Sequence, residues 1–305
     1  MSPQFDYLLE SFTRYLETLN YSPVSVKNAG AFLHEFFTWL TMQKIQRIKD
    51  INPQQVNNYL DYLKHRPNQI NSGSLSAGYI NKHITTLRWF SKYLQITGQA
   101  NLVIKPELLK TAATATHLTK EEIKALYKVA GKQDNIYNQR DTAMLSVFYG
   151  CGLRAGEGEA LNISDILFEK ELIYVRKGKN YKERYVPMNP QVKENLKTYI
   201  TEQRNELLNT SKTEVYLPDR QALLLGRRGN RWSFHGMYQR LQWLKNQTNN
   251  PQLKEKSFGL HILRHSIATH LLQQGMKLEF ISRFLGHKSL ETTQKYTHLV
   301  NDGEL

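Results

Sequence analysis

Residues 261–298 read HILRHSIATHLLQQGMKLEFISRFLGHKSLETTQKYTH, and the rest of the chain is organised around this stretch. His261 and Arg264 are three positions apart, so on a helix they share one face. Apolar side chains recur at helical spacing over residues 266–272, and Gly275 follows them. This pattern predicts a helix that carries His261 and Arg264 and stops at Gly275.

The second half of the stretch predicts two further helices. One covers about residues 278–285 and ends at Gly286, so that His287 lies in the following turn. Ser289 can cap the next helix, which carries Tyr296. Taken singly, a histidine at a helix end usually caps or packs, and a late tyrosine usually lies in a core. Only their combination points to a shared chemical role.

Glycines surround an arginine in residues 150–154, which read GCGLR. They predict a tight turn that brings Arg154 to a fixed place at the start of a helix. A cationic side chain at a helix N-terminus is unfavourable, because that end of the helix dipole is positive. A bound anion would explain the position of Arg154 better than a solvent-exposed surface role. Glu157, one turn later, can orient the guanidinium. Gly156 and Gly158 each cost a helix about 1 kcal/mol relative to Ala, so we expect this helix to be loose.

Two β-type runs, residues 172–176 and 184–187, predict a hairpin. Lys177, Lys179 and Lys182 lie at or near its tip. Lysines at a hairpin tip are usually solvated, but beside a phosphate one of them can protonate a leaving group.

These motifs together resemble the tyrosine recombinase (phage-integrase) family. The matching residues are H-x-x-R-H, L-G-H and Y-T-H in the quoted stretch, G-L-R-x-x-E at 152–157 and G-K-x-x-K-x-R at 178–184. The resemblance covers roughly residues 118–300 by motif and the N-terminal part by layout. The family usually has an apolar residue where Gly158 stands. The resemblance implies the catalytic residues Arg154, Lys179, His261, Arg264, His287 and Tyr296, with Glu157 supporting Arg154 and Lys177 as the alternative to Lys179.

The resemblance also implies the chemistry. A tyrosine hydroxyl has a pKa of about 10 and needs activation before it can attack a phosphodiester. Two arginines can grip the non-bridging phosphate oxygens, and Lys179 can protonate the leaving 5′ oxygen. The 3′-phosphotyrosyl product conserves the bond energy, so neither a nucleotide cofactor nor a metal is expected. In this scheme His261 assists with the proton of Tyr296, and His287 hydrogen-bonds the phosphate.

A zinc site is the alternative interpretation of the histidines in this stretch. His261 and His265 have the spacing of H-x-x-x-H, and His270 follows. Ile262 stands where zinc proteases carry their catalytic glutamate, and Arg264 would repel a cation. We therefore expect no metal.

Residues 1–110 read as a bundle of four short helices. The predicted segments are residues 5–19, a helix started by Ser22-Pro23, another started by Asn52-Pro53, and one after the polar loop 67–74. By resemblance this bundle is the core-binding domain on DNA, although the same bundle could be a protein-interaction module. The expected DNA contacts are Lys27, Lys44, Arg47, Lys82, Arg88 and Lys92 here, with Arg227, Arg228 and Arg231 further along the chain.

Residues 111–116 read TAATAT and predict a linker to a catalytic domain over residues 117–305. That domain should start with a capping box at 119–122 and contain a helix over 190–209, a helix capped by Ser233 and a polar loop at 246–257. The expected fold class is mainly α with a small β-hairpin or sheet in the catalytic domain.

Composition favours an anionic partner. The 305 residues carry 41 Lys+Arg against 27 Asp+Glu, a net charge of +14, and the isoelectric point is about 9.6. The surplus is spread over both parts of the chain, which favours double-stranded DNA over an acidic membrane surface or a simple solubility effect. Cys151 is the one cysteine and no run could span a membrane, so a cytoplasmic location is expected.

The leading hypothesis for the function is a site-specific DNA recombinase that acts as a homotetramer on DNA. A type IB topoisomerase-like nicking enzyme and a DNA-binding regulator without catalysis are the alternatives. Because the bundle begins almost at residue 1, the chain resembles the simpler Xer-like or transposon-borne members. Nine residues follow Tyr296, so little apolar surface is expected there and the free protein should be a monomer.

Overall fold

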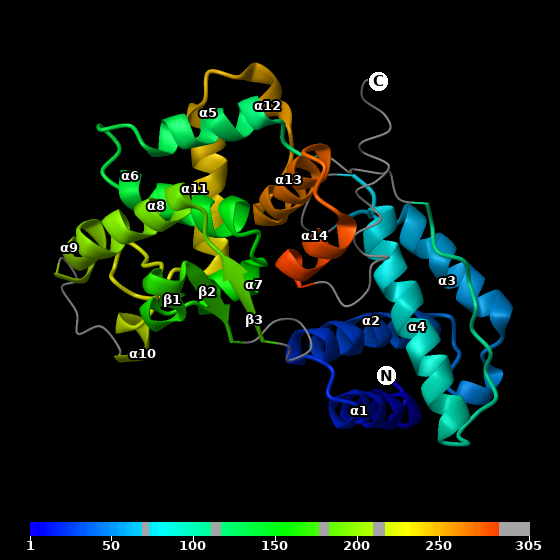
Figure 1. Ribbon diagram of the computed structural model, residues 1–305. Helices are drawn as coiled ribbons and strands as arrows, with labels where there is room; N and C mark the ends of the chain where they lie inside the picture. The colour runs from blue at the N-terminus through cyan, green and yellow to red at the C-terminus, as the bar shows by residue number, and fades with distance from the viewer. Residues whose placement is uncertain (69–72, 111–116, 177–182, 210–216, 287–305) are drawn as a thin grey trace. The chain divides into compact units, whose positions relative to one another are not determined.

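The computed structural model describes residues 1–68, 73–110, 117–176, 183–209 and 217–286 (Figure 1). The chain divides into two compact units, Met1–Thr114 and Ala115–Leu305, and each has a hydrophobic core of its own. The fold is mainly helical with one small antiparallel sheet, as predicted.

The helices of the first unit begin where the sequence places capping residues. Ser2, Ser22, Asn52 and Ser76 each accept a hydrogen bond from the first helical turn, and proline follows the first three of them. The starts predicted at Ser22 and Asn52 are therefore confirmed. The elements are α1 (Pro3–Thr18), α2 (Pro23–Met42), the 3₁₀ turn η1 (Ile48–Asp50), α3 (Pro53–His65) and α4 (Ala77–Ile96).

The core of this unit is aromatic. Phe5 of α1 stacks on Phe37 of α2 with 4.4 Å between ring centroids. The apolar faces of α2, α3 and α4 are buried. Leu19, the last residue of the helix predicted over residues 5–19, is 50% exposed, and α1 ends one residue before it. After α4 the chain runs back across the core, where Ser91 donates to the carbonyl of Leu102.

The second unit begins with helices that lead up to the sheet. Thr119 and Glu122 form the predicted capping box of α5. The helix that begins at Asn138 is α-helical to Leu145 and π-helical afterwards. The elements up to the sheet are α5 (Lys120–Ala130), α6 (Asn138–Leu145), the π turn η2 (Ser146–Gly150), α7 (Ala155–Ala160) and the 3₁₀ turn η3 (Ile163–Asp165).

The sheet is antiparallel in the order β1 (Ile166–Leu167), β2 (Leu172–Val175), β3 (Arg184–Pro187). The predicted hairpin is β2–β3, with Val175 opposite Arg184 at the end next to its tip. β1 and the 3₁₀ turn η4 (Phe168–Lys170) were not predicted. The hairpin tip at 177–182 lies outside the described residues.

Two predictions after the sheet were wrong. The single helix over 190–209 is broken at Glu202, where ψ is −92°, into α8 (Pro190–Thr201) and α9 (Gln203–Asn209). The loop at 246–257 contains α12 (Pro251–Glu255), whose cap Asn250 accepts from the backbone of Leu253. A short α10 (Leu217–Arg220) precedes α11 (Phe234–Gln247), which Ser233 caps as predicted.

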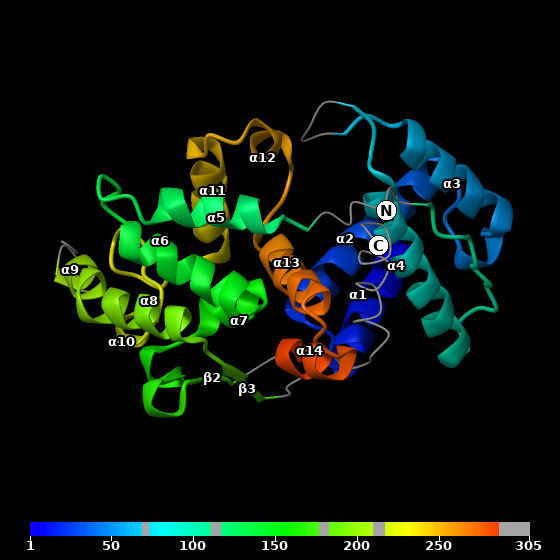
Figure 2. The same ribbon diagram turned by 45° about the horizontal axis from the view of Figure 1, so that its top comes forward.

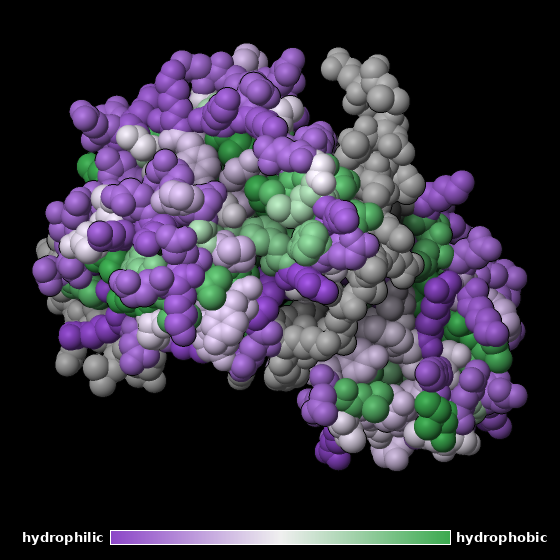
Figure 3. All heavy atoms as spheres, viewed as in Figure 1, coloured by the Kyte–Doolittle hydropathy of each residue, from purple (hydrophilic) through white to green (hydrophobic). Residues whose placement is uncertain are grey.

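The described part of the stretch quoted first folds as α13 (Leu260–Gln273) and α14 (Leu278–Leu285), which pack against each other (Figure 2). Gly275 and Gly286 follow them with φ of +84° and +64°, so both predicted helix ends are confirmed. Ala268, Ile281 and Leu285 form a small core between the two helices. Figure 3 shows hydrophobic residues gathered on the surface over α13 and α14.

No helix in the described part of the chain is long and apolar enough to cross a membrane. Cys151 is buried, and this burial raises the pKa of its thiol to about 12. The thiol is therefore a packing group.

Candidate active site

A glycine turn delivers Arg154 to the start of α7. Gly152 has φ of +59°, and a Cβ there would lie 2.9 Å from Cδ2 of Leu285. Glycine meets both demands, a left-handed backbone and a close approach to α14. Arg154 follows as the N-cap residue of α7, in the tight turn that the sequence predicted.

The helix after Arg154 is tightly packed, which corrects the expectation of a loose one. A Cβ at Gly158 would lie 2.5 Å from the ring of Phe148 and 3.2 Å from Val147. Gly158 therefore makes room for an aromatic core residue. By contrast, a Cβ at Gly156 would meet no atom within 4 Å.

Glu157 holds Arg154 by its main chain and its side chain. Its Oε2 accepts from the backbone nitrogen of Arg154 at 2.9 Å, and its Oε1 accepts from Nη1 at 2.8 Å. On the other side, Nη2 of Arg154 donates to the carbonyl of Gly286 at 3.1 Å. The guanidinium is thus fixed between α7 and the end of α14.

Arg264 reaches the same turn from α13. Its side chain lies on the buried face of that helix and is 4% exposed. Nη1 donates to the carbonyl of Gly152, and Nη2 donates to the carbonyl of Leu285 at 2.6 Å. The two arginines that sequence analysis selected therefore converge on successive carbonyls, those of Leu285 and Gly286.

A third arginine, Arg184, also belongs to the site. It stands in the G-K-x-x-K-x-R motif, but no role was predicted for it from the sequence. Arg184, the first residue of β3, donates from both Nη atoms to the two oxygens of Glu157, each at 2.8 Å. Strand alternation could have found it, because Arg184 and the fully buried Val186 share one face of β3. An inward-facing arginine needs a carboxylate partner, and Glu157 had already been predicted to lie in the site.

The carboxylate of Glu157 is buried and ionised. Burial by itself would raise its pKa, but the hydrogen bonds and charge of Arg184 and the hydrogen bonds of Arg154 lower the pKa to about 2. Glu157 is thus a permanent anion at neutral pH, and it offsets the two adjacent cationic groups.

His261 lies one turn before Arg264 on α13. The residue is exposed, yet desolvation by its neighbours, followed by the positive charges of Arg264 and Arg154, lowers the pKa of the imidazole below its usual value. A lowered pKa keeps the imidazole neutral at pH 7, so it can accept a proton.

Lys179, His287 and Tyr296, with the alternative Lys177, lie outside the described residues. The described residues beside them are part of the site: Gly286 precedes His287 directly, and Arg184 begins the strand after the hairpin tip.

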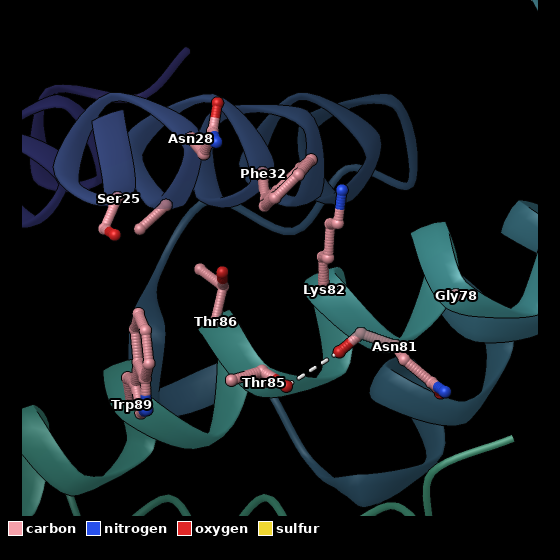
Figure 4. Close-up of a pocket in the computed structure, with 10 residues that line it drawn as sticks. Ser25, Asn28, Phe32, Gly78, Asn81, Lys82, Thr85, Thr86 and Trp89 are labelled. Atoms are coloured by element: carbon pink, nitrogen blue, oxygen red, sulfur yellow. Dashed lines mark hydrogen bonds between the residues drawn. The ribbon is translucent and has the colours of Figure 1, made fainter. Parts of the chain in front are cut away.

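The basic residues expected to bind DNA in the first unit differ in their surroundings. Lys82 lines a groove between α2 and α4 with a cavity volume of about 290 Å³, and Figure 4 shows it extending from α4 toward α2. Arg47 pairs with Asp50 at 2.9 Å, whereas the guanidinium of Arg88 donates to the carbonyl of Pro106. Lys27, Lys44 and Lys92 are exposed.

The expected phosphate anchors of the second unit also differ. Arg227 and Arg228 are exposed on the turn before α11. Arg231 instead donates to the carbonyls of Glu159 and Leu161 and to Oδ1 of Asn162, so its guanidinium ties this turn to the end of α7.

The histidines named for zinc do not gather. His270 is buried, with its Nδ1 2.9 Å from the hydroxyl of Tyr149. Within the described ranges, no three His, Cys, Asp or Glu side chains are placed to hold a metal ion.

Comparison with known proteins gives one consistent result. Residues 116–302 match the model of the phage integrase family. The chain is 32% identical to tyrosine recombinase XerC of Oceanobacillus iheyensis, over 98% of this chain and 93% of the relative. It is 30% identical to tyrosine recombinase XerC of Lacticaseibacillus casei, over 95% of this chain and 93% of the relative.

Solved structures share the fold. The Tn1549 transposon integrase in complex with circular intermediate DNA matches with a TM-score of 0.73 at 17% identity, over 95% of this chain and 94% of that one. The XerH site-specific recombinase bound to a palindromic difH substrate matches with a TM-score of 0.69 at 21% identity, over 93% and 78%.

Proposed function

Since the chain belongs to the phage integrase family, we propose that it recombines DNA through a 3′-phosphotyrosyl intermediate formed on Tyr296. It is a tyrosine-type site-specific recombinase, an enzyme that breaks and rejoins DNA strands.

The observation that carries the proposal is the convergence of Arg154 and Arg264 on the turn before His287. Both side chains are anchored by carbonyl oxygens at the end of α14, so their guanidinium groups are preorganised. A guanidinium has five N–H donors, and Arg154 directs two of them at Glu157 and Gly286, so others remain for the non-bridging oxygens of a phosphodiester. Preorganised donors that meet charge as it develops are usually the largest contribution to catalysis of this kind.

The reaction then proceeds by one bond exchange. The hydroxyl oxygen of Tyr296 bonds to phosphorus while the bond from phosphorus to the 5′ oxygen breaks. The neutral imidazole of His261 accepts the tyrosine proton, and Lys179 gives a proton to the 5′ oxygen. His287 hydrogen-bonds the phosphate beside the two arginines. Attack by a 5′ hydroxyl of the partner duplex reverses these steps and joins the exchanged strand.

Complete recombination of two duplexes cleaves four strands, so we propose four copies of the chain assembled on DNA. The net charge of +14 and the exposed lysines of the first unit supply a salt-dependent attraction to phosphates. A topoisomerase-like enzyme would act on a single duplex and needs no such assembly.

Strand exchange between two differently labelled duplexes tests this proposal. A recombinase yields products that carry both labels, whereas a nicking enzyme relaxes supercoiled DNA and yields none. A catalytically inactive regulator would give neither product and no covalent protein–DNA adduct.

A further inference from the structure

Arg184 and Glu157 form the most enclosed ion pair of the site. Both carboxylate oxygens accept from Arg184 at 2.8 Å, and the side chains are 11% and 3% exposed. An exposed ion pair contributes little, but removing one partner of an enclosed pair leaves an uncompensated charge. The geometry of Glu157 therefore depends on Arg184.

The two Nη groups of Arg184 are directed into the protein, at Glu157. Both of its Nη atoms point at Glu157, and its side chain is about half as exposed as that of Arg154, 11% against 23%. Arg184 is thus poorly arranged to grip a phosphate with a bidentate fork. The role of Arg184 in the site therefore lies in its interaction with Glu157.

Gly286 fixes the stem of Arg184. A Cβ at Gly286 would lie 2.7 Å from Cδ of Arg184 and 2.8 Å from its Nε, and the φ of Gly286 is +64°. The side chain therefore lies directly on the turn to which Arg154 donates. Held by Gly286 and by β3, Arg184 presents its guanidinium to Glu157 at a set angle.

We propose that Arg184 is a positioning residue, which sets the guanidinium of Arg154 by fixing the carboxylate of Glu157. This inference rests on the proposed function, in which Arg154 binds the scissile phosphate. Without Arg184, Glu157 is left with a single arginine partner and is free to rotate toward it. Arg154 then pairs more fully with the carboxylate and moves away from the phosphate.

The test compares Arg184→Gln and Arg184→Lys with wild type in single-turnover cleavage. The substrate is the DNA segment that the protein protects from nuclease, sought first beside its own gene. A nick near the cleavage point lets the freed 5′-hydroxyl fragment diffuse away, so the covalent adduct accumulates. A misplacement of about 1 Å costs roughly 100-fold in rate, so Arg184→Gln should cleave about 100-fold more slowly at saturating DNA with unchanged DNA affinity. Arg184→Lys keeps one charged contact and should fall between.

Arg176→Gln is the matched control. Arg176 directly follows β2 and pairs at 2.8 Å with the buried Asp165, but it makes no contact with Glu157 in the described structure. Its loss should leave cleavage near the wild-type rate. An equal slowing in Arg176→Gln would mean that any disturbance of the hairpin base is enough, and would overturn the inference.

A double-mutant cycle with Arg154→Lys separates positioning from a merely structural role. If Arg184 acts through Arg154, the double variant Arg154→Lys/Arg184→Gln cleaves no more slowly than Arg154→Lys alone. Multiplied effects, or wild-type cleavage by Arg184→Gln, would overturn the inference. If Arg184→Gln melts below the assay temperature, the same cycle is run with Arg184→Lys. An absence of any adduct with wild-type protein would instead refute the proposed function itself.

Discussion

Arg154 and Arg264 donate hydrogen bonds to the carbonyl oxygens of adjacent residues, Gly286 and Leu285, at the end of α14. The last carbonyls of a helix form the negative end of its dipole, which favours cations. The two guanidinium groups are therefore stabilised together before any phosphate arrives. Gly152 and Gly286 make this possible, since both adopt a left-handed backbone where space is short.

Replacing Arg154 by Lys should lower cleavage far more than DNA binding. Lysine is a point charge and cannot bind Glu157, Gly286 and a phosphate from one planar group. Loss of one preorganised donor costs roughly 100- to 1000-fold in rate. Single-turnover cleavage beside a binding titration measures both effects, and Arg264→Lys should behave alike. Wild-type cleavage rates would make Arg154 a structural residue.

Gly158 and Gly156 offer a matched pair in one short helix. Gly158→Ala forces a methyl group against Phe148 and should destabilise the protein by about 1–3 kcal/mol, as overpacking does. Gly156→Ala has open space and should stabilise by up to about 1 kcal/mol from helix propensity. Thermal unfolding of both variants checks this. Equal changes in melting temperature for the two variants would mean that the side chains around Phe148 can move to accommodate the added methyl group.

The stability of the protein should depend on pH through Glu157. Its folded pKa of about 2 lies below the ordinary value of 4.5. The stabilisation is therefore complete above about pH 4.5 and is lost as the pH falls toward 2. At about 1.4 kcal/mol per pKa unit, the loss is on the order of 3 kcal/mol.

Chemical unfolding of wild type and Glu157→Gln between pH 5 and low pH measures this loss. The stability advantage of wild type should shrink on acidification. Glu171→Gln is the control, because its pair with Lys193 is exposed and should matter little at any pH. Parallel profiles for wild type and Glu157→Gln would show that the carboxylate is not held as described.

Lys179→Ala should cleave slowly on normal DNA and recover on DNA whose bridging 5′ oxygen is replaced by sulfur. A thiolate leaves without a proton, so the general acid becomes unnecessary. Cleavage of both substrates by Lys179→Ala and Lys177→Ala measures the effect. Sulfur rescue of Lys177→Ala alone would shift the proton donor by two positions along the hairpin.

Local signals in the sequence predicted much of the fold. Ser22-Pro23 and Asn52-Pro53 start helices because a side-chain acceptor and a fixed φ act within one turn. Gly286 ends α14 for an equally local reason, its left-handed backbone. The two arginines of the site could be named because each stands in a recognisable motif.

Long-range packing explains what the sequence did not reveal. The glycine at 158 depends on Phe148, which comes from the preceding π turn, and no local rule foretells that contact. Arg184 meets Glu157 only because β3 packs beside α14 and α7. The break at Glu202 likewise follows from tertiary contacts, since Gln203 donates to the carbonyl of Ile136 and accepts from the backbone of Arg140.

The central claim is that Tyr296 is the nucleophile, and a covalent-trapping gel tests it most directly. Wild-type protein on nicked site DNA should give a protein–DNA adduct that survives denaturation. Tyr296→Phe should bind the same DNA with unchanged affinity and give no adduct, because only the attacking hydroxyl is removed. A stable adduct with Tyr296→Phe would contradict the account and place the nucleophile elsewhere, with Tyr181 and Tyr185 as the next residues to replace.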